Sequence, residues 1–263
     1  MRLDLPSDLQ RSLCFRTLNV PYTRIFQTWE SVQRHATSGR GAIAADEVSS
    51  VARQPGLRER KKQRTRELIA DTALRLFLER GFEAVTIAEI AQAADVDAKT
   101  IYNYFPSKPD LVFQRLEAFE QALLDAVRTR QAGESTLAAF ARFVLDLQGL
   151  LADEEASEHL RAINRMIVAS PALLAHEEQV FARFTASLAA LLTEETGARA
   201  DDVQPSIVAH ALIGFHRSLV DYVRRATLAG TPNRKLARDL RGQARAALGA
   251  LEHGLGSYGV KGS

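Results

Sequence analysis

The chain has 263 residues, of which 46% are hydrophobic and 25% are charged, and 34 Lys and Arg residues against 32 Asp and Glu residues give a formal net charge of +2. These values are typical of a folded globular protein and exclude a collagen-like or wholly disordered chain. The balanced charge also excludes a uniformly basic protein that coats nucleic acid, but it allows local basic patches.

The content of cysteine and histidine, and the length of the apolar runs, limit which disulfides, metal sites and membrane-spanning helices the chain can have. The single cysteine, Cys14, excludes an intramolecular disulfide and a zinc site built from cysteines. The histidines are dispersed and none has the spacing of an HExxH motif, so we predict no metal site and no cofactor. No apolar run approaches the roughly 18 residues of a membrane-spanning helix. We therefore expect a cytoplasmic protein with no membrane partner.

Residues 1–56 differ in character from the rest of the chain. They hold the only tryptophan, Trp29, together with scattered arginines and a polar stretch. We predict that this segment is a disordered N-terminal extension. Because Met1 and Met166 are the only methionines, a shorter product would start at another codon, and we expect the functional chain to begin near residue 50. The intact mass of the natively expressed protein tests this start, and a mass that includes Met1 would contradict it.

From Leu57 onward the sequence predicts helices throughout. Apolar residues recur at spacings of three and four, and alanine and leucine dominate. Glycines, prolines and one aspartate interrupt the pattern and divide it into about nine helices. We therefore predict an all-α fold. An N-terminal three-helix domain is expected over residues 57–112, a larger helical domain over residues 113–256, and a tail over residues 257–263.

A basic cluster opens the first of these helices. Residues 58–66 read RERKKQRTR and lead into an amphipathic segment with Ile69, Ala73 and Phe77 on one face, which stops at Gly81. A charge run of this kind is more often a solvated face than a binding surface. The cluster alone therefore does not establish contact with nucleic acid. The evidence for such contact comes from the next two helices.

A short helix, a tight turn and a second helix come next. Thr86 and Glu89 have the spacing of a capping box, which predicts that a helix begins there. Asp95 occupies the place in the turn that needs a left-handed conformation. Asp97 is positioned to cap the next helix, over residues 98–105. A helix, a four-residue turn and a helix make up the helix-turn-helix pattern.

The second helix carries more polar and aromatic residues than its packing needs. Ile101 and Phe105, four residues apart, supply its buried edge. Five side chains are left facing outward: Lys99, Thr100, Tyr102, Asn103 and Tyr104. In a DNA major groove, lysine can donate to guanine, asparagine can pair with adenine, and a threonine methyl can meet a thymine methyl, while tyrosine hydroxyls can bind phosphate. The alternative is that the tyrosines belong to the core and the lysine is incidental.

The residues after this helix suggest a phosphate site. Pro106 ends the helix, and Ser107 is a candidate N-cap for the next one. Amides exposed at such a helix start, together with the Lys108 ammonium, can bind a phosphate group. We therefore count Lys108 among the candidate DNA contacts.

Several stretches of residues 60–112 resemble the TetR family of bacterial transcriptional regulators. They are ALRLF from Ala73, GF from Gly81, TIAEIA from Thr86 and IYNYFPSK from Ile101. The spacing between the turn and the YFPSK end is that of the family. Two features depart from it, because Asp95 stands where the family usually has glycine and the N-terminal extension is longer than is typical.

The resemblance implies a homodimer in which each subunit presents one helix-turn-helix to successive major grooves of double-stranded DNA. Two-fold symmetry then predicts an inverted-repeat operator with half-sites on the order of 34 Å apart. The resemblance places the following residues at DNA-contacting positions: Thr86, Lys99, Thr100, Tyr102, Asn103, Tyr104 and Lys108. Arg64 and Arg66 fall where family members often touch the DNA backbone.

In the larger helical domain, the resemblance implies a small-molecule pocket between the middle helices. Periodicity places Phe140, Phe181 and Phe184 in the core, where they are candidate pocket residues. The candidate polar groups are Arg161, Arg165, His176, His210 and His216. Two arginines four residues apart would suit an anionic ligand. The alternatives are that these arginines pair with nearby surface glutamates and that each histidine is an ordinary core or surface residue.

The last two long helices, near residues 204–229 and 233–255, are the candidates for the dimer interface. Each has an apolar stripe: Val208, Leu212, Phe215, Leu219 and Val223 in the first, and Leu236, Leu240, Ala244, Leu248, Leu251 and Leu255 in the second. Pairing with their symmetry mates would make a four-helix interface, as the resemblance also implies. The alternative is that both stripes face the core of their own subunit.

The helix-turn-helix pattern predicts a DNA-binding protein, and the resemblance implies a transcriptional regulator, a repressor that an unidentified small-molecule effector releases from DNA. We find no Ser-His-Asp arrangement, no GxxxxGK motif and no metal-ligand pair, so we predict no catalytic residues and no enzyme. The main alternative is a constitutive DNA-binding protein without an effector, which would coat DNA evenly in a footprint instead of protecting a palindrome. The regulator is expected in the bacterial cytoplasm, associated with the nucleoid when bound.

Overall fold

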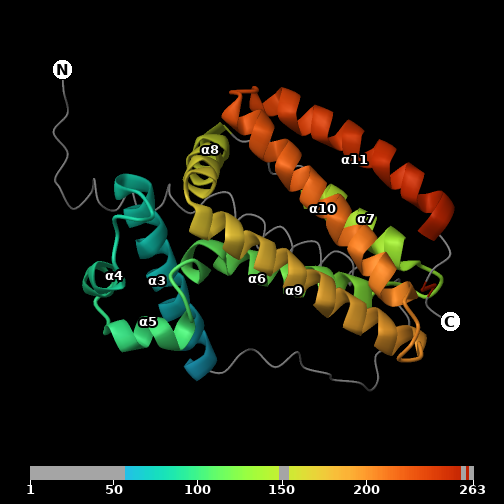
Figure 1. Ribbon diagram of the computed structural model, residues 1–263, viewed down its shortest axis with the longest axis horizontal. Helices are drawn as coiled ribbons and strands as arrows, with labels where there is room; N and C mark the ends of the chain where they lie inside the picture. The colour runs from blue at the N-terminus through green and yellow to red at the C-terminus, as the bar shows by residue number, and fades with distance from the viewer. Residues whose placement is uncertain (1–56, 148–153, 256–258, 261–263) are drawn as a thin grey trace, which may run out of the picture. The chain divides into compact units, whose positions relative to one another are not determined.

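The computed structural model describes residues 57–147, 154–255 and 259–260, and every regular element in these ranges is an α-helix (Figure 1). The predicted extension over residues 1–56, and most of the predicted tail, lie outside the described residues. The chain divides into two compact units, the first ending at Leu111 and the second beginning at Val112. The all-α prediction is confirmed.

The first unit holds three helices, which are α3 (Leu57–Arg80), α4 (Ile87–Ala93) and α5 (Ala98–Tyr104). Their apolar faces meet in a core of fully buried side chains that includes Ile69, Phe77, Ile90, Ile101 and Phe105. The basic cluster forms the first turns of α3, so its cations are displayed on a helix. The predicted order of a helix-turn-helix domain followed by a helical domain is confirmed.

Local hydrogen bonds set where α3 ends and α4 begins. Gly81 adopts φ +88°, a conformation that glycine reaches without steric cost, and its amide donates to the Phe77 carbonyl at 2.8 Å. The capping box predicted at α4 is present, because the Glu89 amide donates to the Thr86 hydroxyl at 3.2 Å and the Thr86 amide donates to the Glu89 carboxylate at 2.7 Å. The sequence therefore predicts both helix ends correctly.

The turn between α4 and α5 contains one expected and one unexpected feature. Asp95 has φ +55°, the left-handed conformation predicted for it. The next amide, of Val96, donates back to the Ala91 carbonyl at 3.0 Å, which closes the turn. Asp97 stands at the N-cap of α5, but its side chain makes no capping hydrogen bond. The expectation that Asp97 caps the helix through its carboxylate is therefore wrong.

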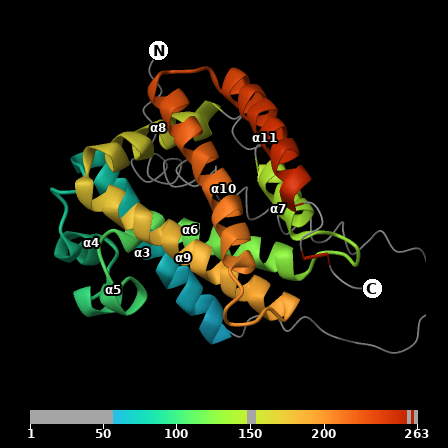
Figure 2. The ribbon, with the colours of Figure 1, turned by 45° about the vertical axis from the view of Figure 1, so that its right-hand side comes forward.

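The second unit is a bundle of longer helices. It contains α6 (Asp110–Arg128), which begins two residues before the boundary, and then α7 (Thr136–Leu147), α8 (Glu154–Ala169), α9 (Pro171–Thr196), α10 (Gln204–Leu228) and α11 (Asn233–Leu255). Helices α9 and α10 pack along each other, and α10 lies between α9 and α11 (Figure 2). Ser170 caps α9 by accepting from the Leu173 amide, and Gly197 ends it at φ +62°.

The larger part of each apolar stripe on α10 and α11 lies inside the subunit. Val208, Leu212 and Phe215 on α10 are buried within the single chain. The same is true of Leu236, Leu240, Ala244 and Leu248 on α11. The covered part of each stripe is not available to a symmetry mate. Leu219 and Val223 on α10, and Leu251 and Leu255 on α11, are only half-buried. The pairing of these two helices in a dimer therefore stays a prediction, and it would use the half-buried ends of the stripes and the outer faces of the helices.

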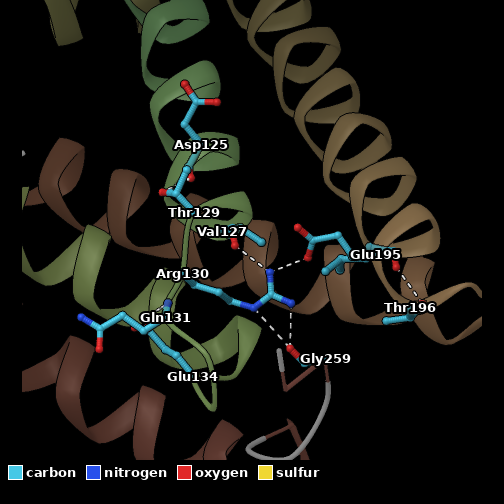
Figure 3. Close-up of polar contacts among 10 residues, drawn as sticks. Asp125, Val127, Thr129, Arg130, Gln131, Glu134, Glu195, Thr196 and Gly259 are labelled. Atoms are coloured by element: carbon cyan, nitrogen blue, oxygen red, sulfur yellow. Dashed lines mark hydrogen bonds and ion pairs between the residues drawn. The ribbon is translucent and has the colours of Figure 1, made fainter. Parts of the chain in front are cut away.

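A buried arginine joins three distant parts of the second unit (Figure 3). Arg130 follows α6 and is only 4% exposed. Its guanidinium donates to the Val127 carbonyl at 2.6 Å, forms an ion pair with Glu195 of α9, and donates twice to the Gly259 carbonyl, at 2.9 and 3.3 Å. Gly259 has φ +58°, and a Cβ there would lie 2.6 Å from the Thr136 hydroxyl. Arg130 therefore fastens the chain near its C-terminal end to α6 and α9.

No helix in the described ranges combines the length and apolar character needed to cross a membrane. Within the same ranges, three or more histidine, cysteine, aspartate or glutamate side chains nowhere gather in a way that could hold a metal ion.

Candidate nucleic-acid interface

Helix α5 separates its residues into a buried edge and a solvent-facing surface. Ile101 and Phe105 are fully buried, whereas Tyr102 is 53% exposed, and Lys99 and Asn103 are exposed. Thr100 and Tyr104 are half-buried at the margins of this surface. The alternative that both tyrosines belong to the core is therefore wrong for Tyr102. We call the side chains of Lys99, Thr100, Tyr102, Asn103 and Tyr104 the α5 face.

The α5 face has donors and acceptors that suit base edges. The Lys99 ammonium supplies a donor, and the Asn103 amide supplies both a donor and an acceptor. In the major groove, these groups match guanine and adenine respectively. The geometry of the unbound unit leaves both side chains exposed and near each other on one short helix.

Arg66 is directed at the end of α5. Its guanidinium donates to the Tyr104 carbonyl at 3.2 Å and lies over the Phe105 ring, with the Cζ atom 4.8 Å from the ring centroid. A carbonyl in the last turn of a helix lacks an intrahelical partner, and a cation there also favours the helix dipole. Arg66 therefore stabilises the C-terminal end of α5. Arg64, in contrast, is exposed on α3.

Lys108 lies over an aromatic pair in the first unit. Its Nζ atom is 4.3 Å from the Phe82 ring centroid and 5.7 Å from that of Phe77, and these two rings are 5.1 Å apart. Desolvation in this half-buried position lowers the pKa of Lys108 from its ordinary value. The Ser107 amide and hydroxyl both donate to the Asp110 carboxylate at 2.7 Å. This amide is thus already bonded in the unbound unit, contrary to the expected open phosphate site.

The capping box uses the one donor of the Thr86 hydroxyl. The hydroxyl accepts from the Glu89 amide and donates to the Glu89 carboxylate at 2.8 Å, and Arg80 donates to the same carboxylate at 2.6 Å. The backbone hydrogen bond from Thr86, followed by the bond from Arg80, lowers the pKa of Glu89 to about 2. Thr86 therefore fixes the start of α4.

Comparison with known proteins identifies the family. Residues 69–114 match the family described as bacterial regulatory proteins, tetR family, and residues 134–246 match the MftR C-terminal domain. The HTH-type transcriptional regulator TcmR of Streptomyces glaucescens is 33% identical over 153 residues, which cover 56% of this chain and 67% of that protein. The chain belongs to the TetR family of transcriptional regulators. Members of this family regulate transcription and are not enzymes.

Two further TetR-family relatives cover different shares of the chain. The putative mycofactocin biosynthesis transcriptional regulator MftR of Mycobacterium tuberculosis is 28% identical over 170 residues, or 62% of this chain and 81% of that protein. The HTH-type transcriptional repressor KstR of Rhodococcus jostii is 36% identical over 89 residues, or 34% of this chain and 38% of that protein. The likeness to MftR thus spans most of that relative, whereas the likeness to KstR covers a shorter part.

The candidate pocket residues of this TetR-family regulator do not come together as one group. Phe140, Phe181 and Phe184 are buried, as their spacing suggests. Arg165 and His210 are exposed, and the His210 ring bonds the Ser206 carbonyl on its own helix. The Arg161 guanidinium donates to the Thr227 carbonyl at 3.0 Å.

Four buried polar residues of α8, α9 and α10, which form two pairs, were not singled out from the sequence. The Asn164 amide donates to the Thr227 hydroxyl at 3.0 Å, and Arg224 forms a buried ion pair with Glu177. Since these partners lie 47 or more positions apart in the chain, sequence spacing gives no signal for them.

Proposed function

We propose that the chain is a repressor that binds an inverted-repeat operator as a homodimer and is released from it by a small-molecule effector. The observation that carries this proposal is the α5 face, which presents base-reading chemistry on an exposed helix of a TetR-type helix-turn-helix. The name of KstR, a transcriptional repressor, supports repression over activation. The protein would act in the bacterial cytoplasm, on the nucleoid.

The DNA contacts divide by chemistry into base reading and phosphate binding. Lys99, Thr100 and Asn103 would read base edges, while Tyr102 and Tyr104 would bind phosphates and fix the orientation of α5. The remaining proposed phosphate contacts are Arg64, Arg66, Thr86 and Lys108. Three of these, Arg66, Thr86 and Lys108, already make contacts within the unbound unit. On binding DNA, each side chain would either keep its contact and add a phosphate, or lose the contact and bind a phosphate instead.

The homodimer would form through the outer faces of α10 and α11. On α10, Ile207 is 58% exposed and Gly214 is open, because a Cβ added there would meet nothing within 4 Å. On α11, Gly242, Ala246 and Ala250 are exposed. Small side chains let two helices approach closely, so these faces suit packing against the same helices of a second copy.

The effector would bind the second unit and act by preferring one arrangement of the dimer over another. A ligand shifts such an equilibrium only by its difference in affinity for the two states. The proposed lining consists of Phe140, Phe181 and Phe184, and the proposed polar groups are Arg161, Arg165 and His210.

Selection of bound DNA from a random pool tests this function. The protein is expected to enrich an inverted repeat whose half-sites lie about one helical turn, or somewhat more, apart. Enrichment of a palindrome supports a dimeric regulator. Uniform recovery of all sequences would contradict the proposal and favour the constitutive, sequence-independent binder.

A further inference from the structure

His216 is a buried polar residue that the rest of the described chain does not satisfy. It lies on α10, its side chain is buried, and neither its Nδ1 nor its Nε2 atom has a hydrogen-bond partner among the described residues. A neutral imidazole has one N–H donor and one acceptor nitrogen. Both of these groups are therefore left without a bond to any residue that the structure describes.

Aromatic rings from two other helices lie against this histidine. The Phe119 ring of α6 stacks on it, with centroids 4.5 Å apart and planes 16° apart, and the Phe181 ring of α9 lies 6.1 Å away. The Phe119 ring is itself 5.2 Å from Phe143 of α7 and 6.3 Å from Phe184 of α9. Phe119 is only half-buried, so the aromatic group can be reached from solvent on that side.

Leaving these nitrogens unbonded lowers the stability of the chain. A buried donor or acceptor without a partner is destabilising, because it has lost its hydrogen bonds to water and gained none in the protein. A phenylalanine would fill a similar volume in this aromatic surrounding without that cost. Features that reduce stability without helping the fold are typical of functional sites. The unbonded imidazole therefore indicates a group whose hydrogen-bond partner is a ligand from outside the chain.

We propose that His216 is the polar anchor of a binding site for an uncharged, planar aromatic compound that carries a hydroxyl or carbonyl oxygen. The rings of Phe119 and Phe181 supply faces for stacking, and the imidazole supplies the hydrogen bond that orients the oxygen. The proposal rests on the proposed function, in that this compound would be the effector.

The surrounding charges favour an uncharged compound over an anion. Desolvation lowers the pKa of His216 to about 4, so the ring is neutral at pH 7 and offers no positive charge. Arg224, further along α10, is already paired with Glu177 and lies 3.6 Å from Asp221, although its buried Nε atom has no hydrogen-bond partner among the described residues. Arg217, the next residue along α10, is paired with Glu178. An anion entering this region would meet no unpaired cation among these groups, and burying it would be costly.

Calorimetric titration with 2-naphthol, and with 2-methylnaphthalene as the analogue without the hydroxyl, tests the proposal. Saturable binding of 2-naphthol to the full chain is expected. His216→Phe should weaken it by roughly tenfold or more and leave 2-methylnaphthalene within about twofold. The control is His253→Phe, an exposed histidine on α11 that belongs to no proposed site, which should change neither. Absence of saturable 2-naphthol binding, or equal binding by His216→Phe, would overturn the proposal.

The Tm of His216→Phe checks that the variant folds and that the His216 nitrogens have no hydrogen-bond partner. Because the variant removes two unbonded groups, its Tm should rise by on the order of 5 °C. A fall in Tm would mean that the imidazole has a partner, such as a bound water, and would overturn the argument. Operator binding is measured separately. If 2-naphthol binds but does not release the operator, the site stands and its role as the effector site fails.

Discussion

Replacing Arg130 by methionine is expected to lower the free energy of unfolding by about 2–4 kcal/mol. Removing one partner of a buried ion pair typically costs about 3–5 kcal/mol, because the other charge is left buried and unpaired. The Glu195 side chain is 19% exposed, so water can partly solvate it after the substitution and the loss should fall somewhat below that range. The Gly259 carbonyl would also lose both of its bonds to the guanidinium.

Urea denaturation of the full chain measures this loss. The matched control is Arg128→Met, because Arg128 is an exposed arginine two residues earlier whose ion pair with Asp125 spans only one helical turn. Exposed pairs contribute roughly 0–1 kcal/mol, so the control should stay close to the parent chain. If the two variants lose the same free energy of unfolding, the bonds from Arg130 to Glu195 and Gly259 stabilise the fold no more than an exposed ion pair does, which contradicts this prediction.

The stability of the protein is expected to fall as the pH drops from about 6.5 towards 4, and His216 accounts for much of that fall. Its pKa is about 4 in the folded chain, against 6.5 for an ordinary histidine, because burial disfavours the charged ring. Between these two values the unfolded chain binds a proton that the folded chain does not bind, which favours unfolding. The contribution is complete above pH 6.5 and is lost as the pH falls towards 4.

Comparison of the parent chain with His216→Phe isolates this effect. Between pH 7.5 and 4.5, the parent should lose about 2–3 kcal/mol more of its unfolding free energy than the variant, at roughly 1.4 kcal/mol per pH unit. Glu89 does not interfere, because its pKa is lowered from 4.5 to about 2, and its contribution is lost only below this window. Equal losses in the two chains would show that the His216 ring is protonated as easily in the folded state as in the unfolded state.

Local features of the fold could be predicted from the sequence because short-range contacts decide them. The capping box of Thr86 and Glu89 and the left-handed Asp95 depend on residues a few positions away, and residue type and spacing are sufficient to find them. The division of α5 into a buried edge and an exposed face arises from helical periodicity in the same way. Asp97 shows the limit of such reasoning, since a favoured N-cap residue makes no capping bond.

Features that depend on distant parts of the chain could not be predicted. Arg130 binds Glu195 and Gly259, which lie 65 and 129 positions further along the chain, and nothing in the local sequence marks it as buried. For Arg66 the sequence predicts only a contact with DNA, but its guanidinium bonds the Tyr104 carbonyl 38 positions away. The apolar stripes of α10 and α11 predict burial correctly, but an amphipathic pattern does not specify which surface covers it. The structure shows that their own subunit covers the larger part of each stripe.

The central claim of this account is that the α5 face reads DNA bases. The most direct measurement is the ratio of affinity for the selected operator to affinity for random DNA, at one salt concentration, for the parent chain, Lys99→Ala, Asn103→Ala and Arg64→Ala. A base contact is worth about 1–3 kcal/mol of discrimination, so the ratio should fall by roughly fivefold to over a hundredfold in at least one of the two α5 variants. In Arg64→Ala, which removes a proposed phosphate contact, both affinities should fall by a similar factor and the ratio should hold. An unchanged ratio in both Lys99→Ala and Asn103→Ala would contradict the claim.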